Sequence, residues 1–222
     1  MKKLCVVLVV CFLMAGNLWS ADQISYNPSN PILILSDLML PRYATAGSGV
    51  PGDPYVIENL LIDMTGKNSN AGIWIKYTRA NVVIRNCKII NGIDALNNKN
   101  NPFSANNLGI QCENVCNLII ENCQVETNNM GMWLEGCLGV SVFDCTVQDN
   151  RYRGIYLMDS KYCVIANNVV KDNSGDDILL NTNFKKPTST CQFNRVTNNT
   201  TRTIHLMGNQ SNNVVKGNED PL

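Results

Sequence analysis

The stretch that decides the fold is "GMWLEGC", Gly131–Cys137, together with the copies of it that recur along the chain. Within it, Met132 and Leu134 alternate with Trp133 and Glu135, which is the two-residue period of a β-strand. If Met132 and Leu134 face a core, then the tryptophan and the carboxylate face solvent. A comparison of the copies should therefore show why a tryptophan lies on an outer face.

A Gly-apolar-x-apolar tetrad recurs at a nearly constant interval. The copies read GIWI, GIQC, GMWL, GIYL, DILL and TIHL, and they begin at Gly72, Gly109, Gly131, Gly154, Asp177 and Thr203. After a first interval of 37 residues, which holds a polar insertion at 95–107, the intervals are 22, 23, 23 and 26. A second apolar motif follows each tetrad, as in VVIRNCKI from Val82. Units this short cannot bury an apolar face alone, so they must stack, and the period fits a parallel β-helix.

These tetrads and the Asn-rich motifs between them resemble the right-handed parallel β-helix repeat of NosD-like periplasmic proteins and pectate-lyase-like enzymes. The segment GSGVPGDPYVIEN, Gly47–Asn59, resembles the start of the first coil in the NosD-like group. The resemblance implies an all-β, single-stranded right-handed parallel β-helix (a solenoid) of about seven coils at 55–222. A capping segment and lead-in loop would occupy 22–54. The resemblance is specific for the fold and not for function, because this scaffold hosts lyases, hydrolases, epimerases and non-enzymes.

Residues 1–21 have the layout of a secretory signal peptide. Lys2 and Lys3 precede an apolar run, and small residues follow near Ser20 and Ala21. The run is shorter than the roughly 20 residues that a membrane span needs. We therefore expect a secreted or periplasmic protein with a bacterial-type signal and no membrane span after its removal; a retained N-terminal anchor is the alternative. Zero net charge and the lack of a basic patch argue against a nucleic-acid partner.

Equivalent residues of successive coils stack about 4.8 Å apart, so columns can be read from the sequence. Two inward columns are expected at Ile73, Ile110, Met132, Ile155, Ile178, Ile204 and at Ile75, Cys112, Leu134, Leu157, Leu180, Leu206. A third inward column is Ile84, Ile120, Val142, Ile165, Cys191, Val215. A fourth, at a turn where the family usually has asparagine, is Leu60, Cys87, Cys123, Cys145, Asn168, Asn194, Asn218.

Eight of the 10 cysteines follow the signal segment. Cys87, Cys123 and Cys145 form either a ladder of small buried thiols or a soft-metal site for Zn²⁺ or Cu⁺. No C-x-x-C is present and histidine is scarce, so the spacing of metal ligands is poor. Cys116 and Cys137 lie on adjacent coils and are the best candidate for a disulfide.

Three columns are expected on the outer face of the tetrad strand. They are Gly72, Gly109, Gly131, Gly154, Asp177, Thr203; then Trp74, Gln111, Trp133, Tyr156, Leu179, His205; then Lys76, Glu113, Glu135, Met158, Asn181, Met207. The glycines would leave a shelf beside an exposed aromatic row, on which sugar rings stack through their apolar faces. The expected carbohydrate-binding residues are Trp74, Gln111, Trp133, Tyr156, Glu113, Glu135 and Lys76. The alternative is that the rings stack only to stabilise the sheet.

Glu113 and Glu135 are expected on adjacent coils, about 5 Å apart, with Lys76 one coil earlier. Two carboxylates this close repel each other, so they must be screened, share a proton or hold a cation. Ca²⁺ would be the natural cation at Glu113 and Glu135. A solvated pair relieved by Lys76 is the alternative, and the fold itself requires no cofactor.

The candidate catalytic residues are Asp176, Asp177, Arg153, Arg202 and His205. The expected column of Arg153, Asp176 and Arg202 is either a surface ion-pair ladder or the cationic cluster that resemblance to polysaccharide lyases implies. "SGDDIL", Ser174–Leu179, resembles the paired-aspartate motif of polygalacturonases, which implies an inverting hydrolysis. The Asn-Thr-Asp, Gly-His-Gly and Arg-Ile-Lys motifs of that family are missing.

The expected function is recognition of a polysaccharide along the outer strand face, with processing of that polysaccharide as an extension. If the protein is an enzyme, it is a polysaccharide lyase or a glycoside hydrolase. Two alternatives stay open. One is a non-enzymatic surface or structural β-helix, and the other is a NosD-like accessory role in copper delivery, which the family resemblance alone suggests.

Overall fold

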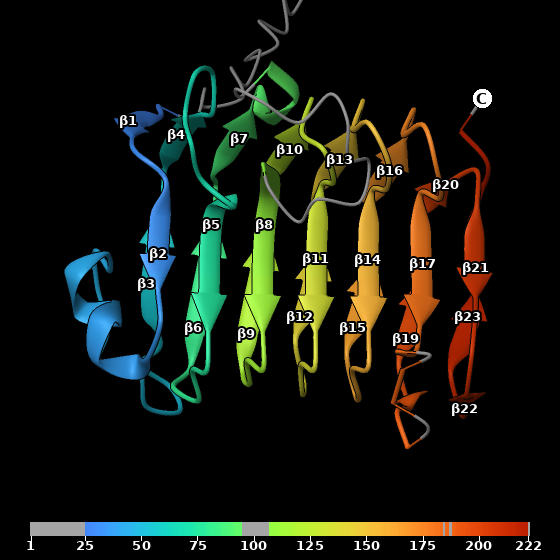
Figure 1. The fold of residues 1–222 in the computed structure, drawn as a ribbon. Coiled ribbons are helices and arrows are strands. Elements are labelled where there is room, and N and C mark those ends of the chain that lie inside the picture. The colour runs from blue at the N-terminus through green and yellow to red at the C-terminus, as the bar shows by residue number, and fades with distance from the viewer. Residues whose placement is uncertain (1–24, 95–106, 184, 187, 222) are drawn as a thin grey trace, which may run out of the picture.

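The chain winds into a stack of coils whose strands form three parallel sheets of seven strands each (Figure 1). The computed structural model describes residues 25–94, 107–183, 185–186 and 188–221. The predicted right-handed parallel β-helix is confirmed. The signal segment at 1–21 and most of the polar insertion at 95–107 lie outside the described residues.

Each coil contributes one strand to each sheet. Sheet A contains β1 (Asn27–Ser29), β4 (Leu60–Asp63), β7 (Lys88–Ile90), β10 (Gln124–Glu126), β13 (Thr146–Gln148), β16 (Val169–Lys171) and β20 (Thr200–Thr201). Sheet B contains β2 (Ile32–Ile34), β5 (Ala71–Lys76), β8 (Leu108–Glu113), β11 (Met132–Glu135), β14 (Ile155–Met158), β17 (Ile178–Asn181) and β21 (Ile204–Leu206). Sheet C contains β3 (Tyr55–Glu58), β6 (Val82–Arg85), β9 (Leu118–Glu121), β12 (Ser141–Phe143), β15 (Val164–Ala166), β19 (Arg195–Thr197) and β23 (Val214–Lys216). A small extra sheet pairs β18 (Cys191–Gln192) with β22 (Gln210–Ser211).

The N-terminal end of the solenoid is closed by a short helix. Strands β1 and β2, within the segment 22–54, pair with β4 and β5 and so begin sheets A and B. The 3₁₀ helix η1 (Asp37–Arg42) then places Leu40 in full burial against the core. Figure 1 shows η1 beside β2 and β3 at this end. A second 3₁₀ turn, η2 (Gly92–Asp94), follows β7. Among the described residues, no helix has the length and apolarity that crossing a membrane would take.

The two inward columns of the tetrads pair in the predicted register, but the third column differs in its fifth member. Ile165 pairs with Val196, whereas Cys191 lies in β18 and pairs with Gln210. The segment between β17 and β19 is longer than its counterparts in earlier coils, so the chain forms β18 before it reaches sheet C. The prediction that Cys191 continues this column is therefore wrong.

The abundant asparagines hold the corners between the sheets. At the corner from sheet C to sheet A, Asn86, Asn122 and Asn167 adopt positive φ, which asparagine tolerates better than most residues. The residue after each of these asparagines belongs to the column that was predicted to contain Cys87, Cys123 and Cys145. In the coil after Asn168, this column contains Asn199 and not the expected Asn194. The same long segment causes both errors.

The thiols of the described residues are all free. Cys87, Cys123 and Cys145 are buried, and each Sγ contacts backbone carbonyl oxygens. The proposed disulfide is wrong, because Cys137 is buried while Cys116 pairs in register with Leu138. These cysteines behave as small hydrophobic residues that fill a turn.

Candidate functional site

A groove of about 490 Å³ runs over the outer face of β11, β14 and β17. Its lining combines aromatic, thioether, amide, hydroxyl and cationic side chains. They belong to Met130, Trp133, Arg153, Tyr156, Met158, Asn181, Thr182, Asn183 and Lys185. Of these, Trp133 and Tyr156 were predicted as carbohydrate-binding residues, and Arg153 was predicted as catalytic.

The aromatic row has the predicted register but less exposure than predicted. Trp133 pairs with Gln111 on one side and Tyr156 on the other. Gln111 and Tyr156 are buried, and Trp74 and Trp133 are only half-buried. The row belongs to a second apolar cluster outside the main core, formed by Ala71, Leu108, Met130, Tyr156 and Leu179 with Trp74, Trp133, Tyr152 and Met158. A groove between packed side chains replaces the open aromatic shelf.

The glycine column faces inward, so the predicted shelf beside the rings is wrong. A Cβ atom on Gly109 would lie 2.1 Å from Cγ1 of Val125, and one on Gly131 would lie 2.3 Å from Cγ1 of Val147. Both valines are buried on sheet A. The chain bends at each glycine as it passes from sheet A to sheet B, so the strict alternation of faces begins one residue later. Glycine is required here for close packing at the corner.

Trp133 and Tyr156 form the apolar wall of the groove. Their ring centroids are 5.6 Å apart with the planes tilted by 43°. The guanidinium of Arg153 lies 4.9 Å from the centre of the Tyr156 ring, and burial raises the pKa of the Tyr156 hydroxyl. Nε1 of Trp133 is buried and has no hydrogen-bond partner among the described residues. The wall of the groove therefore contains two aromatic side chains, with a cation over the Tyr156 ring.

Trp74 and Glu113, two other predicted carbohydrate-binding residues, are hydrogen-bonded to each other. Glu113 Oε1 accepts bonds from Nε1 of Trp74 at 2.8 Å and from Nε2 of Gln111 at 2.9 Å, and Lys76 Nζ lies 2.8 Å from Oε2. The ammonium of Lys76 also lies 4.8 Å from the centre of the Trp74 ring. None of these four side chains lines the groove. Together they brace the outer face of β5 and β8.

Glu135 lies on the rung after Glu113 and lines a separate hollow. Burial, and then the charge of Glu113, raise the pKa of the Glu135 carboxyl. A Ca²⁺ ion takes roughly six to eight oxygen ligands, and both oxygens of Glu113 are already engaged. The described residues contain no group of three His, Cys, Asp or Glu side chains that could hold a metal. The pair therefore fits a Ca²⁺ ion poorly.

We expect Glu135→Gln to stabilise the protein at pH 7 by roughly 0.5 kcal/mol and to have little effect near pH 3. The pKa of this carboxyl is raised in the folded state, so the folded state disfavours the ionised form. Wild-type stability must then fall as pH rises from the ordinary carboxyl range through the raised pKa. The glutamine variant lacks that loss. Urea unfolding at the two pH values measures the difference, and an equal difference at both would contradict the assignment.

The structure brings together three of the five candidate catalytic residues. Nε of Arg153 lies 3.3 Å from Oδ2 of Asp176, and Nδ1 of His205 lies 2.5 Å from Oδ1 of the same carboxylate. Asp176 and Arg153 line a hollow of about 180 Å³ that also shares Met130 with the groove. His205 is mostly exposed. This triplet lies at the border of the groove.

Asp177 and Arg202 lie apart from that triplet. Asp177 continues the inward glycine column, is fully buried and accepts bonds from Nδ2 of Asn173 and the backbone N–H of Arg202, both at 3.0 Å. The Arg202 side chain reaches Asp177 and the carbonyl oxygen of Asn173. Asp176 and Asp177 thus face opposite sides of the coil, because neighbouring residues of an extended chain alternate.

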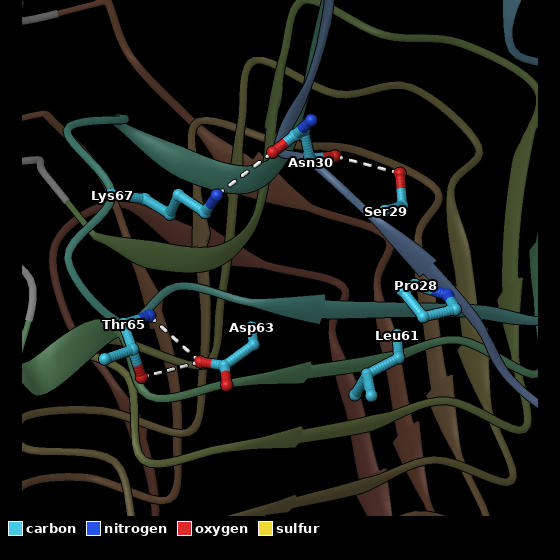
Figure 2. A pocket seen from close by; sticks show the side chains of 7 residues that line it. All are labelled: Pro28, Ser29, Asn30, Leu61, Asp63, Thr65 and Lys67. Carbon is cyan, nitrogen blue, oxygen red and sulfur yellow. Dashed lines mark hydrogen bonds between the residues drawn. The ribbon is translucent and has the colours of Figure 1, made fainter.

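Another hollow, of about 390 Å³, lies at the N-terminal edge of sheet A (Figure 2). Its polar groups satisfy one another. Nζ of Lys67 donates to the amide oxygen of Asn30 at 3.0 Å, and Asp63 accepts bonds from the backbone and hydroxyl of Thr65. These bonds lower the pKa of Asp63. The hollow lacks an aromatic side chain, so the groove on sheet B is the better candidate site.

Sequence reasoning placed Met158 and Asn181 on the outer face without predicting them as ligand-binding residues, and it missed Met130, Thr182, Asn183 and Lys185. A signal for Met130 was present, since an apolar residue precedes the glycine in AGIW, LGIQ and MGMW. Thr182, Asn183 and Lys185 come from the segment between β17 and β18, which is longer than the matching segments of earlier coils. Their position therefore depends on the path of that segment and not on the repeat.

A family model for a right-handed beta helix region matches residues 91–220. No curated protein matches the chain. Three solved structures share 13–15% identity with it. One, from Parabacteroides merdae ATCC 43184 and provisionally described as a glycosyl hydrolase, has a TM-score of 0.48 over 75% of this chain and 81% of that chain. The Agl-KA catalytic domain has a TM-score of 0.49 over 72% and 32%. The A-module of the mannuronan C-5 epimerase AlgE6 from Azotobacter vinelandii has 0.31 over 75% and 64%. Identities this low say nothing about the reaction.

Proposed function

We propose that this chain, which belongs to the right-handed beta helix family because that family's model matches more than half of it, binds a polysaccharide along the groove over β11, β14 and β17. Export through residues 1–21 would bring this groove into contact with extracellular or periplasmic glycans. Binding is the core of the proposal. Processing would be an added activity at the neighbouring Arg153, Asp176 and His205.

The observation that carries the proposal is the composition of the groove. Two aromatic rings, Trp133 and Tyr156, stand on adjacent rungs and are flanked by amide and hydroxyl groups and by the cations Arg153 and Lys185. A sugar presents an apolar C–H face to such rings and hydroxyl groups to the polar neighbours. The groove also follows the solenoid axis from rung to rung, which suits a chain of repeating sugar units.

A purely structural role for the aromatic row accounts for the groove less well. If the aromatic side chains only stabilised the sheet, they would be expected to pack against the side chains of adjacent strands without leaving a groove. Instead, the side chains of Trp133 and Tyr156 border about 490 Å³ of accessible space. Trp74, which lies in the same column, shows what a bracing role looks like, since its indole N–H and ring are both occupied by neighbours.

We expect Trp133→Ala to weaken polysaccharide binding about tenfold, because the loss of one stacked ring costs about 1.4 kcal/mol. Trp74→Ala is the matched control, since it removes the same side chain from the same column outside the groove. Affinity electrophoresis against a panel of soluble polysaccharides identifies ligands, and calorimetry measures both variants. Unchanged binding by Trp133→Ala, or an equal loss in Trp74→Ala, would refute the assignment of the groove.

A further inference from the structure

Two aromatic rings lie stacked and exposed at the corner between sheets B and C. The centroids of Tyr162 and Phe193 are 5.0 Å apart and their planes differ by 7°. Tyr162 is 56% exposed and Phe193 is 41% exposed. The two residues occupy the same turn position in successive coils, so the spacing of the coils sets the spacing of the rings.

The backbone at this turn position does not favour aromatic residues. From the coil that contains β9 onward this position has a positive φ, and the coils other than those of Tyr162 and Phe193 use residues that accept this conformation easily: Asn117 (φ 55), Gly139 (φ 67) and Asn212 (φ 56). Tyr162 and Phe193 adopt φ of 56 and 58, which is unfavourable for residues with a bulky side chain. Strain of this kind is often found where a side chain has a role beyond folding.

One face of the Tyr162 ring is open. Phe193 covers the face toward the next coil, whereas the preceding coil has Gly139 at this position. A Cβ atom on Gly139 would have no atom within 4 Å. Leu138, which precedes Gly139 in the chain, is 45% exposed. A ring bound above Gly139 would therefore continue the stack of Phe193 and Tyr162 by one coil.

A polar hollow of about 290 Å³ reaches the residue next to this open face. Lys161, which lines the hollow, directly precedes Tyr162. The rest of the lining supplies carboxylate, amide, hydroxyl and amine groups, among them those of Asn114, Glu135, Asp159, Lys186 and Ser189. A flat apolar face beside many donors and acceptors matches a sugar ring. Asp159 is already bonded to the backbone N–H of Asn183 at 2.8 Å and to the Ser189 hydroxyl at 3.0 Å, so Glu135, Lys161 and Lys186 supply the charged groups that would meet the hydroxyls of a sugar.

We propose that Tyr162 and the adjoining hollow form a second saccharide-binding site, separate from the groove on sheet B. The ligand class rests on the proposed function, while the site rests on its own geometry. The segment between β17 and β18 stands between the two sites, with Asn183 and Lys185 on the groove and Lys186 and Ser189 on the hollow. A glycan that reached both sites would gain from their linkage.

The test uses Tyr162→Asn, with Phe193→Asn as the matched control. Asparagine is the residue that other coils use at this φ, so both variants are expected to fold. Tyr162→Asn removes the open ring face, and Phe193→Asn leaves it in place. The probes are hexasaccharides of galacturonate, mannuronate, xylose and N-acetylglucosamine, titrated by calorimetry. We expect about tenfold weaker binding for Tyr162→Asn and near-wild-type binding for Phe193→Asn.

The outcomes separate this site from the groove. Weaker binding in Tyr162→Asn supports the second site, whether or not Trp133→Ala also weakens binding. Loss in Trp133→Ala with unchanged binding in Tyr162→Asn overturns the second site and leaves the groove standing. Equal loss in Tyr162→Asn and Phe193→Asn overturns the role of the open face. Failure of the wild-type protein to bind any of the four probes overturns the second site.

Discussion

Replacing Gly131 by alanine should lower the free energy of unfolding by about 3 kcal/mol, at the upper end of what overpacking a core costs. The added Cβ would lie 2.3 Å from Cγ1 of Val147 and 2.6 Å from the carbonyl oxygen of Gly154. Neither atom can move easily. Val147 is a buried, β-branched residue of sheet A, and the Gly154 carbonyl accepts the rung bond from Met132 N–H at 2.8 Å. The coils would have to separate locally.

Gly66→Asn is the control for this substitution. Gly66 has a φ of 66 and no atom within 4 Å of its Cβ position, so asparagine fits both the space and the backbone. Its expected effect is within about 0.5 kcal/mol. Denaturant unfolding of the two variants measures the contrast. A Gly131→Ala protein as stable as the wild type would mean that this glycine faces solvent, as the shelf interpretation required.

Replacing Asn168 by alanine should cost about 3 kcal/mol, because three buried hydrogen bonds are lost together. Nδ2 of Asn168 donates to the carbonyl oxygen of Val142 at 3.0 Å and to Oδ1 of Asn199 at 2.9 Å. Its own Oδ1 accepts the backbone N–H of Cys145 at 3.0 Å. Alanine would leave the buried N–H of Cys145 without a partner, and such a group carries its full desolvation cost.

Asn168→Cys is the informative comparison. The preceding coil has Cys145 at the same position, where its Sγ lies 3.4 Å from the backbone nitrogen of Cys123 and 3.7 Å from the carbonyl oxygen of Ile120. A thiol can thus make weaker versions of the same bonds, and we expect a loss of about 1 kcal/mol. If cysteine proved as damaging as alanine in thermal and urea unfolding, the thiol ladder would not be a substitute for the asparagine ladder.

The repeat made the fold and most of the register predictable from sequence. The tetrads keep a nearly constant spacing, and side chains alternate strictly along a strand, so Met132, Trp133 and Tyr156 could be assigned to their faces and columns. The same logic failed for Cys191 and Asn194, because the longer segment before them shifts which residues reach sheet C. A column is predictable only while each coil has the same path.

The candidate site was predictable in part for the same reason. The aromatic row came from the repeat, but its burial depends on Leu108, Met130 and the segment after β17, whose packing no repeat specifies. The inward orientation of Gly131 was also not predicted. The alternation of side chains along a strand does not show where the chain bends between two sheets. The outward tryptophan of GMWLEGC is thus one wall of a groove and not part of an open shelf.

The central claim is that a polysaccharide lies against Trp133, and the indole N–H signals of ¹⁵N-labelled protein test it most directly. The oligosaccharide selected by the binding panel would be titrated while the Nε1–H signals of Trp133 and Trp74 are followed. Trp133 lines the groove, whereas the Trp74 N–H is held by Glu113 outside it. We predict a progressive shift of the Trp133 signal and a constant Trp74 signal. Binding that leaves the Trp133 signal unchanged would contradict the account.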